Sequence, residues 1–198
     1  MKYPAHLLKL IDLLKKLPGV GNKSAERFAF DILNWSEEAL CQTADVIANV
    51  KMHLQHCTQC GSLIGIEECP FCSCARQSQR KICVVAQSRD VFAIESTHEY
   101  HGLYHVLGAL LSPMMGIGPE KMRFTKLYER IAENQSAEVV IALDSTLEGD
   151  ATALFLKQQL EPLNVQISRL AFGLPIGSSL EYVDGGTLAR AFTARGQF

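Results

Sequence analysis

Four cysteines between residues 57 and 72 constrain the fold of this chain more than any other feature. They are Cys57, Cys60, Cys69 and Cys72, in the spacing C-x2-C-x8-C-x2-C. Two residues between paired cysteines let both sulfurs reach one ion from a tight turn, and four thiolates complete the tetrahedral shell that Zn²⁺ accepts. Because four protein ligands leave no open position, the pattern predicts one structural zinc ion per chain. A segment this short needs such a staple, since it cannot bury enough apolar area to hold itself.

Other assignments of the cysteines stay open at this point. The four could be ordinary buried thiols or form two disulfides, although the paired spacing favours metal. Cys74 and His56 lie at the edges of the cluster and could compete as ligands. The two remaining thiols, Cys41 and Cys83, lie on apolar faces and are predicted to be core residues.

Composition indicates a globular protein of one or two domains. The chain has 198 residues, of which 47% are hydrophobic, and no run of 18 apolar residues that would predict a membrane span. The N-terminal segment is amphipathic and lacks the small-residue cleavage site of a signal peptide. Seven cysteines, four of them placed for metal, favour a reducing cytoplasm.

Charge is distributed unevenly along the chain. The net charge is -2, yet residues 1–27 carry +4 and the remainder carries -6. A basic arm on an acidic body predicts that contact with nucleic acid is made by the arm.

The first 56 residues have the pattern of a helical arm. Apolar residues at helical spacing predict a helix over residues 5–16, which Pro18, Gly19 and Gly21 end. Asn22 is a candidate N-cap for a second helix. Its apolar face would be Ala25, Phe28, Ala29 and Ile32. Ser36 and the acids after it predict a third helix, whose one apolar face would be Leu40, Ile47, Val50 and Leu54.

The order helix, Leu-Pro-Gly-Val-Gly, helix is typical of a helix-hairpin-helix element. Gly19 and Gly21 have no side chains, so a phosphate can approach the backbone N–H groups at the start of the second helix. Lys23 and Arg27 lie one turn apart there and can pair with neighbouring phosphates, which positions nucleic acid without reading its sequence. The alternative is a tight turn in a helical bundle.

Residues 80–170 alternate between strand and helix patterns. Strands are predicted over residues 82–86, 105–111, 137–143 and 165–170, and helices over 88–97, 120–134 and 149–160, with 112–119 as a loop. The inner side of the first of these helices would hold Val91, Ala93 and Ile94. The helix over 120–134 would present Met122, Leu127, Tyr128 and Ile131. Such alternation predicts a parallel sheet covered by helices on both faces.

Three carboxylates follow the third of these strands. Asp144, Glu148 and Asp150 lie where ligands of parallel sheets gather, so they form a candidate Mg²⁺ site. The alternative is a solvated loop whose acids cap the following helix. Residues 171–179 are too apolar for a simple exposed loop and are a candidate subunit interface.

The chain as a whole resembles the RecR family of bacterial recombination mediators. The resemblance runs essentially from end to end. Its carriers are LPGVGNKSAERFAF, the four-cysteine run, ICVV followed by RDVFAIE, GLYHVLGALLSPMMGIGP, LEGDATA and GLPIGSSLEYVDGGTL.

The resemblance implies four segments. They are a helix-hairpin-helix DNA-binding arm (1–56), a four-cysteine zinc knuckle (57–72), a Toprim domain (80–170) and a C-terminal segment (171–198) that exchanges between subunits. It further implies a homo-oligomer, from a dimer to a ring tetramer, that surrounds gapped, single-stranded or duplex DNA. Its implied partners are RecO and RecF. The implied task is loading RecA onto single-stranded DNA coated by single-strand-binding protein. DNA contact maps onto Lys23 and Arg27, RecO contact onto the acidic residues 144, 148 and 150, and zinc onto the four cysteines.

The chain also departs from catalytic Toprim domains, which carry a glutamate after the first strand and D-x-D after the third. Here those positions hold Ala86, and Thr146 in place of the second aspartate, so Mg²⁺ binding is doubtful. Tyr100 and Tyr104 have the context of packing residues rather than nucleophiles. The sequence therefore favours an α/β protein with an all-α arm that acts as a non-enzymatic DNA clamp. The alternatives are a Mg²⁺-dependent Toprim nuclease or primase-like enzyme, and a zinc-stapled scaffold that binds only proteins.

Overall fold

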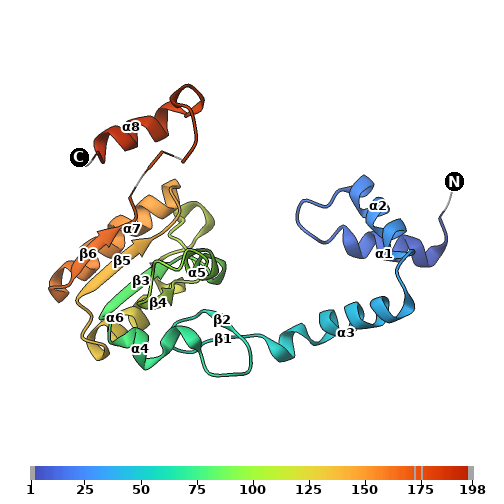
Figure 1. Cartoon of the computed structure of the whole chain (residues 1–198), viewed down its shortest axis with the longest axis horizontal. Coiled ribbons are helices and arrows are strands. Elements are labelled where there is room, and N and C mark those ends of the chain that lie inside the picture. Colours follow the sequence, from blue (N-terminus) through green and yellow to red (C-terminus); the bar gives the residue numbers. More distant parts are fainter. Residues whose placement is uncertain (1–2, 172, 175, 196–198) are drawn as a thin grey trace. The chain divides into compact units, whose positions relative to one another are not determined.

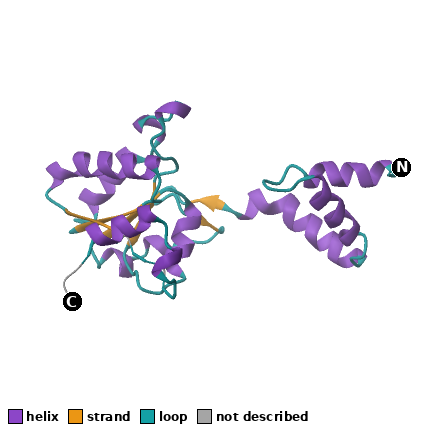
Figure 2. Cartoon of the chain, turned by 90° about the horizontal axis from the view of Figure 1, so that it is seen from above, coloured by secondary structure: helices purple, strands orange, loops and turns teal. Residues whose placement is uncertain are grey.

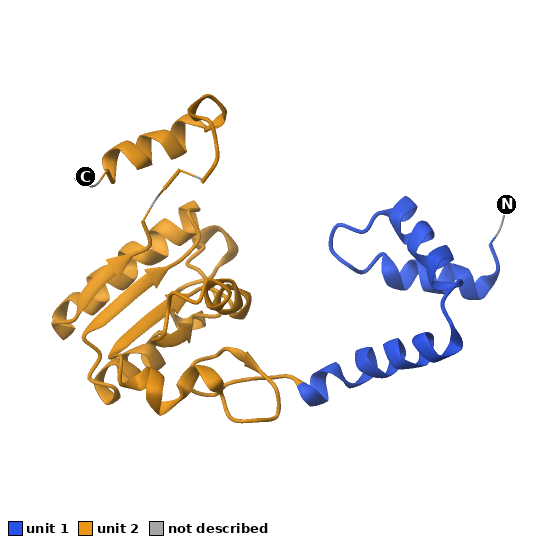
Figure 3. Cartoon of the chain, in the orientation of Figure 1, with its two compact units in different colours: residues 1–53 blue, residues 54–198 orange. Residues whose placement is uncertain are grey.

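The protein folds as two compact units. A computed structural model describes residues 3–171, 173–174 and 176–195, and it separates Met1–His53 from Leu54–Phe198 (Figure 3). Figure 1 labels the helices and strands of both units.

The first unit is helical, as the sequence predicts. It consists of α1 (Ala5–Leu14), α2 (Asn22–Ile32) and α3 (Glu37–His53). Helices α1 and α2 pack around a small core of Ile11, Ala25 and Ala29. The Ser36 side chain caps α3, since its Oγ accepts a hydrogen bond from the backbone N–H of Ala39 (3.2 Å).

Three expectations for this unit are wrong in detail. Gly21 rather than Asn22 is the N-cap of α2, and Asn22 is the first helical residue. Phe28 is 37% exposed rather than buried beside Ala25 and Ala29. The expected apolar face of α3 is not buried either: Ile47 and Val50 are exposed and Leu40 is half-buried, while Leu54, also exposed, lies beyond the helix at the start of the second unit. Helical spacing identifies a face, but it does not say whether another element covers that face.

The second unit contains the predicted parallel sheet. Its strands are β3 (Lys81–Val85), β4 (Leu103–Val106), β5 (Glu138–Ala142) and β6 (Gln166–Arg169), in the order β4-β3-β5-β6. Each neighbouring pair is parallel. The carboxyl ends of all four strands therefore lie along one edge.

Helices cover both faces of this sheet, as Figure 2 shows. Alternate residues of β3 enter two different cores: Ile82 and Val84 pack on one side, and Cys83 and Val85 on the other. The first core also takes residues from α6 (Phe124–Glu133) and α7 (Leu147–Leu160). The second takes Val91 of α5 (Ser88–Glu95) together with residues of the cysteine-rich segment.

Some boundaries in this unit differ from expectation. Strand β4 ends at Val106, and residues 107–111 continue as a loop, buried at Leu107, exposed at Gly108 and half-buried afterwards, rather than as strand. Helix α6 begins at Phe124, so the buried Met122 precedes it. Ala93, expected on the inner side of α5, is exposed. An apolar run is compatible with either a strand or a buried loop, which explains the error at β4.

The cysteine-rich segment forms a small ribbon before the sheet. It contains β1 (Gln55–His56) and β2 (Leu63–Ile64), which pair antiparallel, then a 3₁₀ turn at Pro70–Cys72 and the short α4 (Cys74–Gln77). Cys83 is buried as expected, whereas Cys41 is exposed and not a core thiol.

A last helix, α8 (Gly185–Thr193), was not expected from the sequence. Of the segment proposed as a subunit interface, residues 172 and 175 lie outside the described part of the chain.

Among the described residues, no helix combines the length and apolarity needed to cross a membrane.

Candidate metal centre and nucleic-acid interface

The structure brings the four predicted cysteines together. Their sulfur atoms all lie within 4.8 Å of one another, and within the described residues they are the one such group of three or more metal-ligating side chains. Sγ of Cys57 is 4.0 Å from that of Cys72, and Sγ of Cys60 is 3.6 Å from that of Cys69. Four thiolates bound tetrahedrally at ~2.3 Å would be about 3.8 Å apart. The sulfur positions therefore fit the binding of one metal ion, whereas a disulfide needs an S–S distance of ~2.05 Å.

The backbone around the first pair fixes this geometry. Gly61 has φ +79°, a left-handed conformation that turns the chain tightly after Cys60. Its N–H donates to the carbonyl of Cys57 (2.9 Å), and the Cys57 N–H donates to the carbonyl of Ser62 (2.8 Å). The Cys60 carbonyl accepts from Val106 at the end of β4 (2.7 Å). The first sulfur pair is thereby attached directly to the sheet.

A buried arginine supplies positive charge beside the cluster. Arg130 of α6 is 3% exposed, its Nη1 donates to the carbonyl of Tyr104 (2.5 Å), and its Nη2 lies 3.9 Å from Sγ of Cys72. Among the described residues no carboxylate lies within ion-pair distance of it. A buried charge is costly unless it is compensated. Four thiolates around a divalent ion carry a net charge of about -2, which would compensate the guanidinium.

His105 is held neutral against this arginine. It is fully buried; Nε2 donates to the carbonyl of Arg123 (2.9 Å), and Nδ1 accepts from Arg130 (3.2 Å). Burial, followed by the charge of Arg130, lowers the pKa of His105 to about 3. Because the His105 ring is neutral, it adds no second positive charge to that of the buried Arg130 guanidinium beside the thiolates.

The protonation of the thiols also indicates a need for a cation. Burial, then the nearby Cys60, raises the pKa of Cys69 to about 12, and a hydrogen bond with Cys60 together with burial raises the pKa of Cys72. The hydrogen bond from Cys72 lowers the pKa of Cys60 to about 4. Cys60 therefore loses its proton readily, while Cys69 and Cys72 hold theirs more tightly. A bound metal ion would replace the remaining protons.

The two rival ligands lie outside the sulfur group. Cys74 begins α4 and is exposed. His56 turns toward the Gly61 carbonyl, to which its Nδ1 donates (3.1 Å). The geometry favours the four cysteines that the spacing predicts.

The glycine turn between α1 and α2 leaves the start of α2 open. Gly19 has φ +79°, and a side chain added at Gly19 or Gly21 would meet nothing within 4 Å. No side chain caps the N-terminus of α2. Its first N–H groups are therefore available to an external acceptor, and the helix dipole favours an anion there.

Two basic side chains of α2 lie beside this opening. Lys23 and Arg27 are exposed and one turn apart, while Ala25 and Ala29 are buried against α1. Two residues correspond to about 200° around a helix, so the basic pair lies opposite the packed face. The arrangement can bind successive phosphates without reading bases.

The acidic residues after β5 do not form a common site. Glu148 and Asp150 belong to the first turn of α7, which Thr146 caps by accepting from the Gly149 N–H (3.1 Å). Asp144 and Glu148 are exposed. The expected loop is thus mainly a capped helix start, and the described carboxylates are not grouped as metal ligands.

Asp150 is bound by two arginines that sequence reasoning missed. Its carboxylate pairs with Arg169 of β6 (2.5 Å) and with Arg190 of α8 (2.8 Å). These hydrogen bonds lower the pKa of Asp150. Arg190 also donates to Ser145 (2.6 Å), so it ties α8 to the sheet edge. The signal for α8 was Asp184, whose side chain caps the helix at the Thr187 N–H (3.0 Å).

Residues considered for catalysis are placed for packing. Ala86 is 4% exposed at the end of β3, and its methyl group cannot ligate metal or transfer a proton. Burial raises the pKa of Tyr100 and of Tyr104, so neither phenol is activated as a nucleophile.

Comparisons with known proteins agree with this geometry. Three family models match: "RecR, helix-hairpin-helix" over residues 7–51, "Toprim domain" over 80–171 and "RecR, C-terminal" over 173–195. A Recombination protein RecR of Protochlamydia amoebophila is 59% identical over the full length of both chains. That of Chlamydia pneumoniae is 48% identical over 98% of each chain. That of Deinococcus radiodurans is 46% identical over 98% of this chain and 88% of its own.

Replacing Cys69 by serine should remove most of the bound metal and lower the free energy of unfolding of the second unit by several kcal/mol, because metal-binding energy is folding energy here. Elemental analysis and urea unfolding measure the two effects. The matched control is Cys74→Ser, which should keep the metal. Stoichiometric metal in Cys69→Ser that disappears only when Cys74 is also replaced would identify Cys74 as a ligand.

Replacing Asp150 by asparagine should loosen the attachment of α8. The amide exchange rate of residues 185–193 should rise by up to about fivefold, which corresponds to the free energy that a surface ion pair contributes. Hydrogen–deuterium exchange measures it, and Glu148→Gln is the control. Because the folded-state pKa is lowered, the native contact is present above the unfolded pKa and is lost as the pH falls through the folded value. Equal exchange in both variants would refute the role of Asp150.

Proposed function

Because the chain belongs to the RecR family of recombination proteins, we propose that it is a non-enzymatic DNA-binding clamp of recombinational repair. The uncapped start of α2, open above Gly19 and Gly21 and flanked by exposed Lys23 and Arg27, is the observation that carries this proposal. Backbone N–H groups and paired cations suit phosphate of any sequence.

The proposed division of labour follows the segments predicted from the sequence. Residues 1–56 bind DNA, and 57–72 hold one structural Zn²⁺ that fixes the base of the arm to the body. Residues 80–170 present a partner surface, and 171–198 exchange between copies. The sulfur geometry and the buried Arg130 support a divalent ion at the second segment, and an all-thiolate shell favours zinc among the common ions.

The proposed partners are RecO and RecF, and the proposed task is loading RecA onto single-stranded DNA coated by single-strand-binding protein, in the cytoplasm. The exposed carboxylates of Asp144 and Glu148 remain available to a protein partner, whereas Asp150 is paired with two arginines. Assembly from dimer to ring tetramer would place several hairpins on one DNA, and effective concentration then compensates for the weak binding of each.

A Mg²⁺-dependent nuclease or primase-like enzyme has less support. Ala86 and Thr146 replace the acids that such chemistry uses, and Asp150 is engaged elsewhere. Mg²⁺-dependent DNA cleavage that Asp144→Asn abolishes would overturn the non-enzymatic proposal. A scaffold without DNA contact is the other alternative, and the following experiment decides it.

The double substitution Lys23→Ala/Arg27→Ala should weaken binding to labelled gapped DNA by about ten- to a hundredfold at low salt. The slope of the logarithm of the binding constant against the logarithm of the salt concentration should fall by the amount that corresponds to about two phosphate contacts. Fluorescence anisotropy at several salt concentrations, without and then with RecO, measures this. The control Lys9→Ala/Lys51→Ala removes the same charge from α1 and α3. An unchanged salt slope would exclude the hairpin, and no binding by the native protein would favour the scaffold.

Gly21→Ala tests the approach of the backbone to phosphate. The added methyl group meets no atom of the protein, and φ is -82°, so stability should change by less than about 1 kcal/mol. DNA affinity should nevertheless fall severalfold, because the methyl group occupies the space of the incoming phosphate. Unfolding and anisotropy measured together distinguish these effects. Unaltered affinity would mean that DNA does not contact this turn closely.

A further inference from the structure

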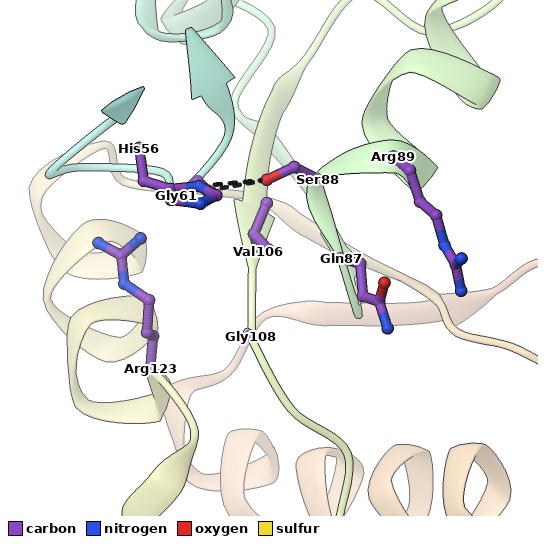
Figure 4. A pocket seen from close by; sticks show the side chains of 8 residues that line it. All are labelled: His56, Gly61, Gln87, Ser88, Arg89, Val106, Gly108 and Arg123. Carbon is purple, nitrogen blue, oxygen red and sulfur yellow. Dashed lines mark hydrogen bonds between the residues drawn. The ribbon is translucent and has the colours of Figure 1, made fainter. Parts of the chain in front are cut away.

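A pocket of about 510 Å³ lies in the second unit, at the carboxyl ends of β3 and β4. The β1–β2 ribbon, the start of α5 and the segment before α6 surround it (Figure 4). Its lining residues are His56, Gly61, Gln87, Ser88, Arg89, Val106, Gly108 and Arg123. Its volume is that of pockets that hold small organic ligands.

The pocket is basic. None of the described lining residues is acidic, and two are arginines. Arg123 is anchored by the carbonyls of Thr58 (2.6 Å), Cys57 and Gln59, none of which neutralises its charge. Arg89 is 76% exposed, and its Nε forms an ion pair with Asp90 at 3.8 Å, which is too long for a hydrogen bond. Its terminal nitrogens can therefore serve a ligand.

Neutral polar groups are already oriented around this charge. Ser88 Oγ donates to the Gly61 carbonyl (3.1 Å), as His56 Nδ1 does, so the other ring nitrogen of His56 is left for another partner. Figure 4 shows His56 and Arg123 on one side of the pocket and Gln87 and Arg89 on the other. Gly108 has φ +84°, and a side chain there would meet nothing within 4 Å, so the floor stays open.

We propose that this pocket binds a phosphate group carried by a nucleotide, so that the second unit contacts DNA directly in addition to the hairpin. The proposal rests on the DNA-binding function proposed above and adds a second site to it. Arginine donors form strong, charge-assisted hydrogen bonds to phosphate oxygens. The volume leaves room for the sugar or base attached to that phosphate.

The test uses the full-length protein in which Lys23→Ala/Arg27→Ala has silenced the hairpin. Two probes distinguish the source of the phosphate: a labelled oligothymidylate and free thymidine monophosphate as its competitor. Adding Arg89→Ala should weaken oligonucleotide binding by about tenfold and lower the salt slope by about 0.7, the value for one phosphate of a single strand. Arg89→Lys should restore most of the binding, since it keeps the charge.

Lys157→Ala is the matched control, because it removes one exposed charge of α7 outside the pocket. Weaker oligonucleotide binding with Arg89→Ala but not with Lys157→Ala supports the pocket as a binding site for a DNA strand. Displacement of that strand by the free nucleotide supports the phosphate group itself as the ligand. Equal effects of Arg89→Ala and Lys157→Ala would overturn the proposal, as would binding of an acidic peptide but of neither nucleotide probe.

This test separates the pocket from the hairpin. If the native protein binds the oligonucleotide and the hairpin variant loses all binding, the pocket proposal fails while the proposed function stands. If the native protein binds no DNA, the proposed function fails by itself. Direct titration with thymidine monophosphate then decides the pocket: binding that Arg89→Ala abolishes supports it, and no binding refutes it.

Discussion

The convergence of four thiols on one point is the constraint on which the second unit depends. Cys57 and Cys60 reach that point from the ribbon, and Cys69 and Cys72 reach it from the 3₁₀ turn. Without a cation, the buried sulfurs compete for protons and Arg130 has no counter-charge among the described residues. With one, the metal-bound thiolates carry a net charge of about -2, which supplies the guanidinium with a counter-charge while His105 stays neutral. The same ion then fixes the loop that forms one wall of the basic pocket, because Gly61 follows Cys60 directly.

Charge is separated along the carboxyl edge of the sheet. Arg89 of α5 and Arg123, which precedes α6, lie beside the ends of β3 and β4. Asp144 follows β5, and Asp150 of α7 pairs with Arg169 of β6 and Arg190 of α8. An edge that in a metal-dependent enzyme would gather carboxylates therefore has arginines at one half, and acids partly paired with arginines at the other. This division favours recognition over chemistry, in agreement with the membership of the chain in a family of recombination proteins.

Features that depend on short stretches of sequence could be predicted, and features that join distant stretches could not. The cysteine spacing, the glycine turn before Lys23 and the parallel strands are local patterns, and each has its counterpart in the structure. By contrast, nothing near Asp150 in the sequence indicates that Arg169 and Arg190 bind it, and nothing near Arg130 indicates Cys72. The exposed apolar residues of α3 show a related limit, because periodicity does not reveal what covers a face.

The contact between Asp150 and Arg190 carries a choice of partner. It joins α8 to the same chain, but an identical arginine on a second copy could make the same bonds to this carboxylate. A tethered helix has an effective concentration in the millimolar range, so the contact within one chain is favoured over the same contact with a second copy at lower concentration. If copies exchange α8, as proposed above, the free energy for that exchange must come from contacts other than this ion pair. The ion pair would then fix the place where α8 docks without specifying which copy supplies the helix.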